Sequence, residues 1–160
     1  MIELPTPRDT RRLGRALGEL AGPGDLIVLA GPLGAGKTVL AQGIGAGLGV
    51  PDRVVSPTFV LARVHRRGRV PLVHVDAYRL GSVAEIDDLD LDADLADSVT
   101  VVEWGRGLVE RLSDAHLLVR LDRSDPADAG VLTETRTAHL VAHGGDWHRR
   151  IATLSAPADR

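Results

Sequence analysis

The sequence predicts a single α/β domain with three layers, in which a mixed, mostly parallel sheet has helices on both faces. The apolar run 26–30 lacks polar alternation, which is typical of a strand buried on both faces of a sheet, and 99–103 is predicted to be a second buried strand. A glycine-rich segment joins the first run to a helical pattern. No repeat or linker divides the 160 residues, and this length suits one domain with its own core.

The first half of the chain predicts a helix, a strand, a glycine loop, a second helix and then a β-hairpin. The first helix covers 9–20, where apolar residues recur at helical spacing and Thr6 or Asp9 is the candidate cap. A break rich in Gly and Pro ends this helix before the strand 26–30. The later segments are the loop 31–36, the helix 37–48, and the hairpin strands 59–64 and 70–76 with a basic tip at 65–69.

The second half continues the alternation of helices and strands. An acidic helical pattern precedes the buried strand 99–103, and two later strands flank a loop rich in Asp, Pro and Gly. We expect the domain to cover residues 1–154 and the segment 155–160 to be a disordered tail. The predicted helices of this half are 82–97, 107–112 and 147–154, and its remaining strands are 116–121 and 135–143.

The glycine-rich segment, GPLGAGKT at 31–38, matches the phosphate-binding pattern G-x-x-x-x-G-K-[ST] at every fixed position. It holds the only lysine of the chain, Lys37, whereas the other 18 basic residues are arginines. An ammonium group is a compact charge that reaches between two phosphates, which a planar guanidinium does less well. Gly34 and Gly36 let N–H groups turn toward phosphate oxygens. The motif therefore predicts a P-loop NTPase-like fold, with Lys37 on the β- and γ-phosphates and Thr38 on Mg²⁺.

Hydrolysis also needs a carboxylate near the metal and the attacking water, and the sequence offers two. Asp76 and Glu103 each end an apolar run, and the pattern alone does not rank them. Either acid alternatively pairs with an arginine such as Arg79 or Arg106. The segment 56–58 (Ser-Pro-Thr) lies where switch segments of nucleotide hydrolases often fall, although it is also an ordinary turn.

Four segments, in this order, resemble the TsaE family, also called YjeE. They are GPLGAGKT, SPTF at 56–59, HVDAYRL at 74–80 and VEWG at 102–105. The resemblance covers roughly residues 5–150, and its third and fourth segments are more specific than the phosphate loop. It implies a small bacterial ATPase needed to form threonylcarbamoyladenosine in tRNAs that read codons beginning with A. It also implies a TsaB–TsaD partner complex, through which tRNA is reached indirectly.

The resemblance assigns roles to individual residues. Thr38 and Glu103 become the Mg²⁺ ligands, Asp76 the water-orienting or general-base carboxylate that acts with Lys37, and Thr58 part of the switch. Three positions depart from residues common in the family without being proposed metal or phosphate contacts, namely Pro32, Val39 and Arg106. The ATP or ADP contacts that it implies are Pro7, Leu33, Gly34, Ala35, Gly36, Lys37, Thr38 and Trp104.

Composition narrows the class of protein. The net charge of −3 gives no overall basic field for nucleic acid, and the absence of cysteine excludes disulfides and thiolate metal sites. No apolar stretch approaches the ~18 residues of a membrane span. Arginines interrupt the first twenty residues, which argues against a signal-peptide core. We expect a cytoplasmic protein that is a monomer by itself.

Three other functions are compatible with a phosphate-binding loop. A GTPase is disfavoured because the chain contains no Asn for an Asn-Lys-x-Asp motif that reads guanine. A small-molecule kinase is disfavoured because no insertion is long enough to form an arginine-rich substrate lid. A nucleotide-sensing module with negligible turnover stays open, since a partner can complete the site.

Two further patterns concern packing and surface. The glycines of 43–47 lie inside a predicted helix rather than before one, so they do not form a dinucleotide-binding fingerprint. We expect them to let the helix approach the sheet.

The basic hairpin tip either meets phosphates or an acidic partner, or is a solvated turn. Its cationic residues are Arg63, His65, Arg66, Arg67 and Arg69.

Overall fold

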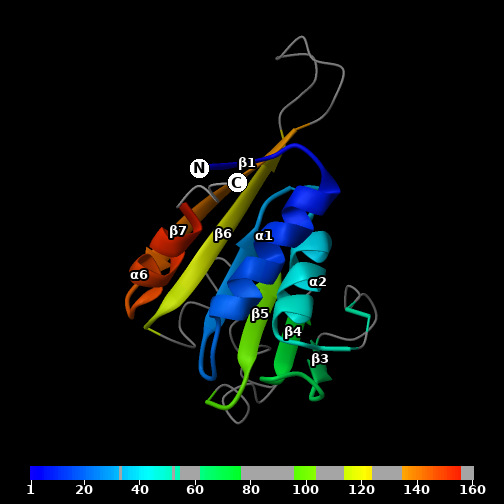
Figure 1. The fold of residues 1–160 in the computed structure, drawn as a ribbon, viewed down its shortest axis with the longest axis vertical. Helices are drawn as coiled ribbons and strands as arrows, with labels where there is room; N and C mark the ends of the chain where they lie inside the picture. Colours follow the sequence, from blue (N-terminus) through cyan, green and yellow to red (C-terminus); the bar gives the residue numbers. More distant parts are fainter. Residues whose placement is uncertain are drawn as a thin grey trace.

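The computed structural model describes residues 1–32, 34–51, 53–54, 62–76, 96–103, 114–123 and 135–155. These residues form one seven-stranded sheet in the order β1-β7-β6-β2-β5-β4-β3 (Figure 1). Strand β2, which precedes the glycine loop, lies at its centre. The strands are β1 (Ile2–Leu4), β2 (Leu26–Ala30), β3 (Ala62–His65), β4 (Leu72–Asp76), β5 (Val99–Glu103), β6 (His116–Arg123) and β7 (Arg136–His143).

The sheet is mixed, as the sequence predicts. Its four central strands, β6, β2, β5 and β4, run parallel, whereas β1–β7, β6–β7 and β3–β4 are antiparallel pairs. Three of the six described pairings are therefore antiparallel, so a mostly parallel sheet is correct only for its centre. The β3–β4 pair is the predicted hairpin, with Ala62 opposite Val75 and His65 opposite Leu72.

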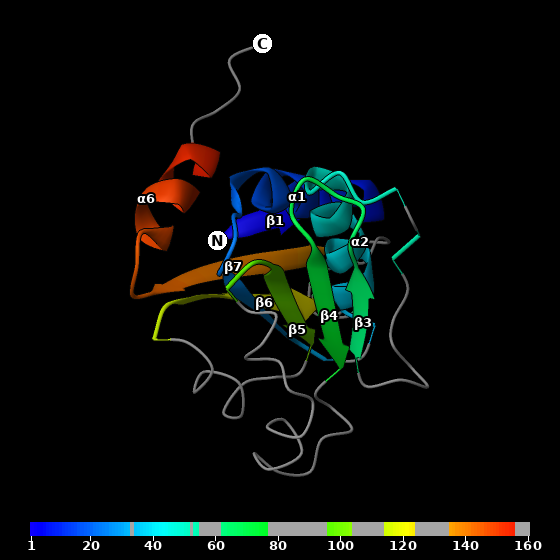
Figure 2. The same cartoon turned by 90° about the horizontal axis from the view of Figure 1, so that it is seen from below.

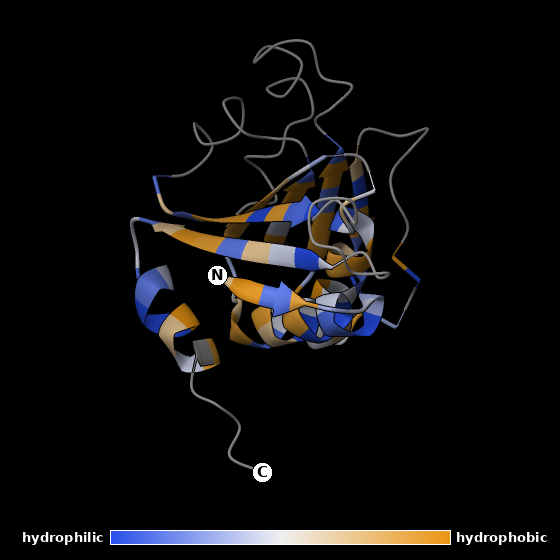
Figure 3. Ribbon diagram, turned by 90° about the horizontal axis from the view of Figure 1, so that it is seen from above, coloured by the Kyte–Doolittle hydropathy of each residue, from blue (hydrophilic) through white to orange (hydrophobic). Residues whose placement is uncertain are grey.

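The central strands are buried on both faces, which confirms the reading of their apolar runs. Every residue of β4 and β5 is buried, and so are the first four residues of β2. One face contributes to the core shared with the helices, and the opposite face, which includes Val28, Val75 and Val102, is buried as well. The strands are accordingly coloured mainly as hydrophobic in Figure 3.

The described helices are α1 (Pro7–Leu20), α2 (Lys37–Gly47) and α6 (Trp147–Ala152), which a 3-10 turn over Thr153–Ser155 follows. All of them lie over the same face of the sheet (Figure 2). The predicted helix 107–112 and nearly all of 82–97 lie outside the described residues, so a helix on the second face stays a prediction. Ala96 and Asp97 form a turn, so the acidic helix does not reach Asp97.

Helix α1 begins two residues earlier than predicted, because Thr6 rather than Asp9 is its cap. The two residues form a capping box: the backbone N–H of Asp9 donates to Thr6 Oγ1 at 3.3 Å, and the N–H of Thr6 donates to Asp9 Oδ2 at 2.9 Å. Pro7 occupies the first helical position, where its missing N–H costs no hydrogen bond.

Helices α1 and α2 touch through glycines. A Cβ on Gly14 would overlap the carbonyl oxygen of Leu40 and lie 2.9 Å from Gly43 Cα, and Gly18 and Gly47 face each other in the same way. The expectation that the α2 glycines approach the sheet is therefore wrong for Gly43 and Gly47, which approach the backbone of α1. It is right in part for Gly45, whose Cβ would lie 3.6 Å from the Leu72 side chain on β4 and closer still to Val54.

Candidate nucleotide-binding site

The glycine loop connects β2 to α2 in a conformation that only glycine adopts easily. Gly34 has a φ of 77° and Gly36, the residue before α2, a φ of 102°. A Cβ on Gly31 would overlap the carbonyl oxygen of Leu121 on β6, so this glycine also lets the loop start against the neighbouring strand. The pattern G-x-x-x-x-G-K-[ST] thus encodes both the turn and the close approach.

Lys37 is the first residue of α2 and is only 6% exposed. Its Nζ donates hydrogen bonds to the carbonyl oxygens of Gly31 and Pro32, at 2.8 Å and 2.9 Å. Burial lowers the pKa of the ammonium, and the carboxylates of Glu103 and Asp76 partly oppose this effect. The single lysine therefore has its charge inside the loop and within the field of both predicted acids.

Asp76 and Glu103 lie side by side at the carboxyl ends of β4 and β5. They are partners in the parallel register, and Glu103 is in turn the partner of Leu29 on β2. Their exposed fractions are 7% and 3%. Because the carboxyl ends of parallel strands meet at one edge of the sheet, the structure brings both acids to the edge where the loop begins. The Glu103 carboxylate raises the pKa of Lys37 more than the Asp76 carboxylate does.

His74 is part of this edge, and the sequence analysis gives it no role. Its Nε2 lies 3.4 Å from Glu103 Oε1, and both side chains are almost fully buried. Among the described residues, neither His74 ring nitrogen nor Glu103 Oε1 makes a hydrogen bond. The histidine stands two residues before Asp76 on β4, and that spacing on a strand is the signal that would have placed it on the same face.

Two arginines from β6 and β7 also reach the loop, and sequence reasoning does not find them. Arg136 donates from Nη2 to the carbonyl oxygen of Gly34 at 3.1 Å. Arg123 is its partner in the antiparallel register, and its Nη1 would lie 3.1 Å from a Cβ on Gly34. Arg136 therefore binds Gly34 directly, and the guanidinium of Arg123 lies beside the same residue. Nothing in the local sequence indicates this contact, because it depends on the register of two distant strands.

The remaining predicted residues are placed as follows. Thr38 is the second residue of α2 and is half-buried. Pro7 is exposed on the first turn of α1, and a side-chain methyl of Thr10 would lie 3.6 Å from a Cβ on Gly36, so this turn borders the loop. Three further predicted site residues, Leu33, Thr58 and Trp104, lie outside the described residues.

Comparison with known proteins shows which family this chain belongs to. The model of a family described as "Threonylcarbamoyl adenosine biosynthesis protein TsaE" matches residues 4–130. The chain belongs to the TsaE family. This confirms the resemblance seen in the sequence motifs.

Relatives of this TsaE chain share more than half of its residues over most of its length. The protein named "tRNA threonylcarbamoyladenosine biosynthesis protein TsaE" from Mycobacterium tuberculosis is 53% identical over 81% of this chain and 83% of its own. The protein of the same name from Streptomyces coelicolor is 53% identical over 86% and 93%. The crystal structure of Bacillus subtilis YdiB superposes with a TM-score of 0.76 at 28% identity and covers 96% of this chain and 92% of its own.

Two features of the described residues bear on cofactors and membranes. Within the described ranges, no three His, Asp or Glu side chains are grouped so that they could hold a metal ion by themselves. Every helix in the same ranges is too short or too polar to span a bilayer. Mg²⁺ commonly takes only one or two carboxylates from a protein and its other ligands from substrate phosphates and water, so the donor set at this edge fits it.

Proposed function

We propose that this TsaE-family protein binds and hydrolyses ATP with Mg²⁺ during the formation of threonylcarbamoyladenosine in tRNA, and that it acts with a TsaB–TsaD complex. The names of its relatives support the tRNA-modification role. The burial of Lys37 between the glycine loop and two strand-end carboxylates carries the ATPase part of the proposal. Phosphate binding offsets the free-energy cost of this burial, because a polyphosphate places negative charge beside the desolvated ammonium.

The start of α2 supplies the other part of phosphate recognition. Gly36 precedes the helix in the left-handed conformation, so the first N–H groups of α2 and the positive end of its dipole face the loop. Arg136 Nη2 donates a hydrogen bond to the Gly34 carbonyl oxygen of the same loop. The loop is thus fixed from outside by an arginine and from inside by Lys37, before any ligand enters.

Thr38 and Glu103 are the residues that would hold Mg²⁺, since a hydroxyl and a carboxylate are the hard oxygen ligands it prefers. Glu103 Oε1 is a buried atom without a hydrogen-bond donor among the described residues, and this leaves it able to take a ligand. When bound, the metal offsets charge on the β- and γ-phosphates. Asp76, next to Glu103 in the register, is then the acid that orients water and accepts its proton.

The proposal is tested by ATP affinity and phosphate release, measured for the protein alone and with a TsaB–TsaD complex and tRNA. Lys37→Ala is expected to abolish tight ATP binding, and Lys37→Arg to restore little of it, because a planar guanidinium does not fit inside the loop. Thermal melting of each variant checks the fold. ATP affinity that survives Lys37→Ala in a folded protein refutes the site. Phosphate release without any phosphorylated small molecule distinguishes a hydrolase from a kinase.

A further inference from the structure

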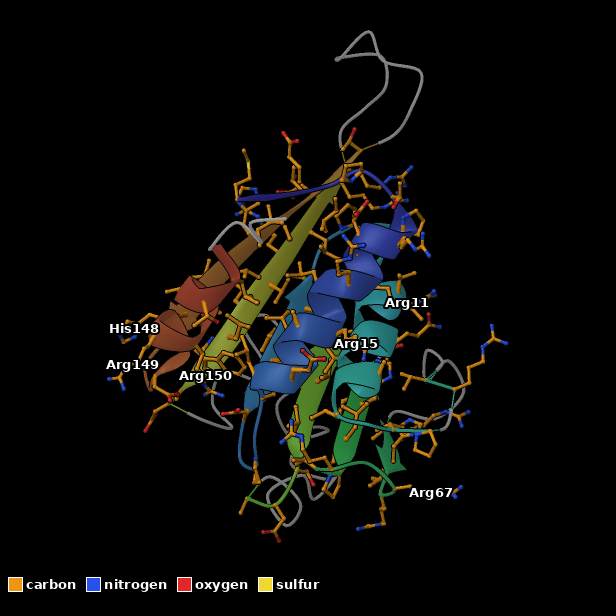
Figure 4. All side chains as sticks on the ribbon, in the orientation of Figure 1. Arg11, Arg15, Arg67, His148, Arg149 and Arg150 are labelled. Carbon is orange, nitrogen blue, oxygen red and sulfur yellow. The ribbon has the colours of Figure 1, made fainter. Side chains whose placement is uncertain are left out.

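The outer side of α1 is a row of arginines. Arg8, Arg11, Arg12 and Arg15 are all exposed, whereas the opposite side of the helix, with Leu13, Gly14, Leu17 and Gly18, is buried. Residues three and four apart are neighbours on a helix surface, so the four guanidinium groups follow one another over two turns. Figure 4 shows Arg11 and Arg15 on α1, which lies in front of the sheet in that view.

The basic hairpin tip is fastened to the end of this same helix. Arg69 donates from Nη2 to the carbonyl oxygens of Gly18 and Ala21, at 3.1 Å and 2.9 Å, and its backbone N–H donates to Leu48 at the end of α2. The Arg69 side chain therefore binds the tip to α1. The side chains of Arg66 and Arg67 on the tip are exposed. These bonds place the tip at the carboxyl-terminal end of the arginine row.

A shallow groove extends the basic surface along the side of α2. It has a volume of about 290 Å³. Arg11, Gln42 and Arg53 line it together with three apolar residues, and Arg11 Nη2 lies 3.3 Å from Gln42 Oε1. We call the whole surface the arginine face, and it consists of Arg8, Arg11, Arg12, Arg15, Arg53, Arg66 and Arg67.

Acidic side chains do little to cancel this charge within the described residues of α1. Glu19 pairs with Arg15 at 3.2 Å, and both side chains are largely exposed. Asp9 is engaged in the capping box with Thr6, and its pKa is lowered by that hydrogen bond first and by the nearby Arg12 and Arg8 charges to a smaller degree. The chain as a whole carries a net charge of −3, so the excess of arginine on this face is local and is not part of an overall positive charge.

The arginine face suits a phosphate backbone better than a protein partner. Protein interfaces are usually centred on exposed apolar or aromatic anchors. Among the described residues, the exposed large hydrophobic ones are Met1, Val64 and Val141; none is on α1, and only Val64, on β3, adjoins the hairpin tip. Guanidinium groups bind phosphate with two parallel hydrogen bonds. Helix α1 carries no aromatic residue and the tip only His65, so base stacking has few platforms there.

We propose that the arginine face binds the phosphate backbone of tRNA directly and without regard to base sequence. This goes beyond the proposed function, in which tRNA is reached through the partner complex. The contact needs neither ATP nor the loop. It therefore predicts that the protein alone binds tRNA, and that the Lys37→Ala variant binds it as well as the wild type does.

The test is the affinity of the full chain for a fluorescently labelled tRNA, measured by anisotropy without nucleotide at several salt concentrations. Four phosphate contacts would weaken binding about 50- to 150-fold between 50 mM and 200 mM salt, from the general slope of about 0.7–0.9 per contact. Arg12→Gln on α1 and Arg67→Gln on the tip are each expected to lower that slope by about 0.7–0.9, and together by about twice as much.

Arg120→Gln is the matched control, because Arg120 is an exposed arginine on β6 whose side chain points to the other face of the sheet. It removes the same charge and is expected to leave the slope unchanged. The proposal is overturned if the wild type does not bind tRNA at 50 mM salt, or if Arg120→Gln weakens binding as much as Arg12→Gln. It is also overturned if the arginine face affects only binding to TsaB–TsaD, since that result identifies an acidic protein surface as the partner. If the wild-type protein binds tRNA but does not hydrolyse ATP, the result refutes the proposed function and leaves the tRNA-binding proposal standing.

Discussion

Replacing Gly43 with alanine should separate two helices that now touch through their backbones. The new Cβ would overlap the carbonyl oxygen of Arg11 and lie 2.9 Å from Gly14 Cα and 3.0 Å from the backbone nitrogen of Arg15. Optimal carbon–carbon contacts are about 3.5–4.0 Å, so the carbon pair alone is too close by at least roughly 0.6 Å. All three neighbours are backbone atoms, and no side-chain rotation can relieve the overlap.

The expected cost follows from two opposing effects. Alanine favours a helix over glycine by about 1 kcal/mol, which would stabilise the protein at an open site. Overpacking a tight interface costs about 1–3 kcal/mol, and a contact with backbone on three sides belongs at the upper end. We expect a net destabilisation of about 2 kcal/mol, which lowers the melting temperature by about 4–8 °C for a domain of this size.

Thermal unfolding followed by circular dichroism measures this shift, and Gly22→Ala is the control. A Cβ on Gly22 meets nothing within 4 Å, so its melting temperature should stay close to that of the wild type. The double variant with Gly14→Ala should lose less than the sum of the two single losses, because one added methyl already moves the helices apart. An unchanged or higher melting temperature for Gly43→Ala would refute the backbone contact between α1 and α2.

Three other predictions concern the site and the first helix. Asp76→Asn should lower the rate of phosphate release with little change in ATP affinity. Glu103→Gln should instead weaken the Mg²⁺-dependent part of ATP binding, measured in a Mg²⁺ titration. The reverse pattern would show that the roles of the two carboxylates are exchanged. Arg136→Gln removes the hydrogen bond to Gly34 and should weaken ATP binding by about 1 kcal/mol, or roughly fivefold, in a calorimetric titration, while Arg120→Gln should not. The hydrogen bond from Thr6 lowers the pKa of Asp9 below 3.8, so its stabilising effect is present above that pH and is lost as the pH falls through the folded-state pKa. The stability advantage of the wild type over Asp9→Asn, measured by thermal melting, should therefore shrink below about pH 4, and an advantage that is constant with pH would contradict this.

The parts of the fold that the sequence predicts well are those with a dense local signal. The strands 26–30 and 99–103 have the predicted bounds because continuous apolar runs end sharply at polar or glycine residues. Asp76 and Glu103 come together because each ends such a run and parallel strands share an edge. Strand β1 has only three residues, too few for an alternation to show, and it forms because β7 offers its edge.

The parts that the sequence does not predict depend on registers between distant segments. Arg136 reaches the loop across 102 positions, and only the pairing of β6 with β7 brings it there. The same holds for the glycines at 14, 18, 43 and 47. Their four-residue spacing is visible in each helix, but the rotation that turns the two pairs toward each other is set by packing on the sheet.

Helix α1 joins the two proposed sites because of this packing. Its buried side meets α2 backbone to backbone, its first turn borders Gly36 of the loop, and its outer side carries the arginine row. Side chains can absorb small shifts between most helices by changing rotamers, but glycines have none to change. A displacement of α2 at the loop is therefore expected to move α1 as well, and with it the arginine row on the outer side of α1. We infer that the phosphate loop and the arginine row of α1 move together, and this requires no contact between the bound nucleotide and the tRNA.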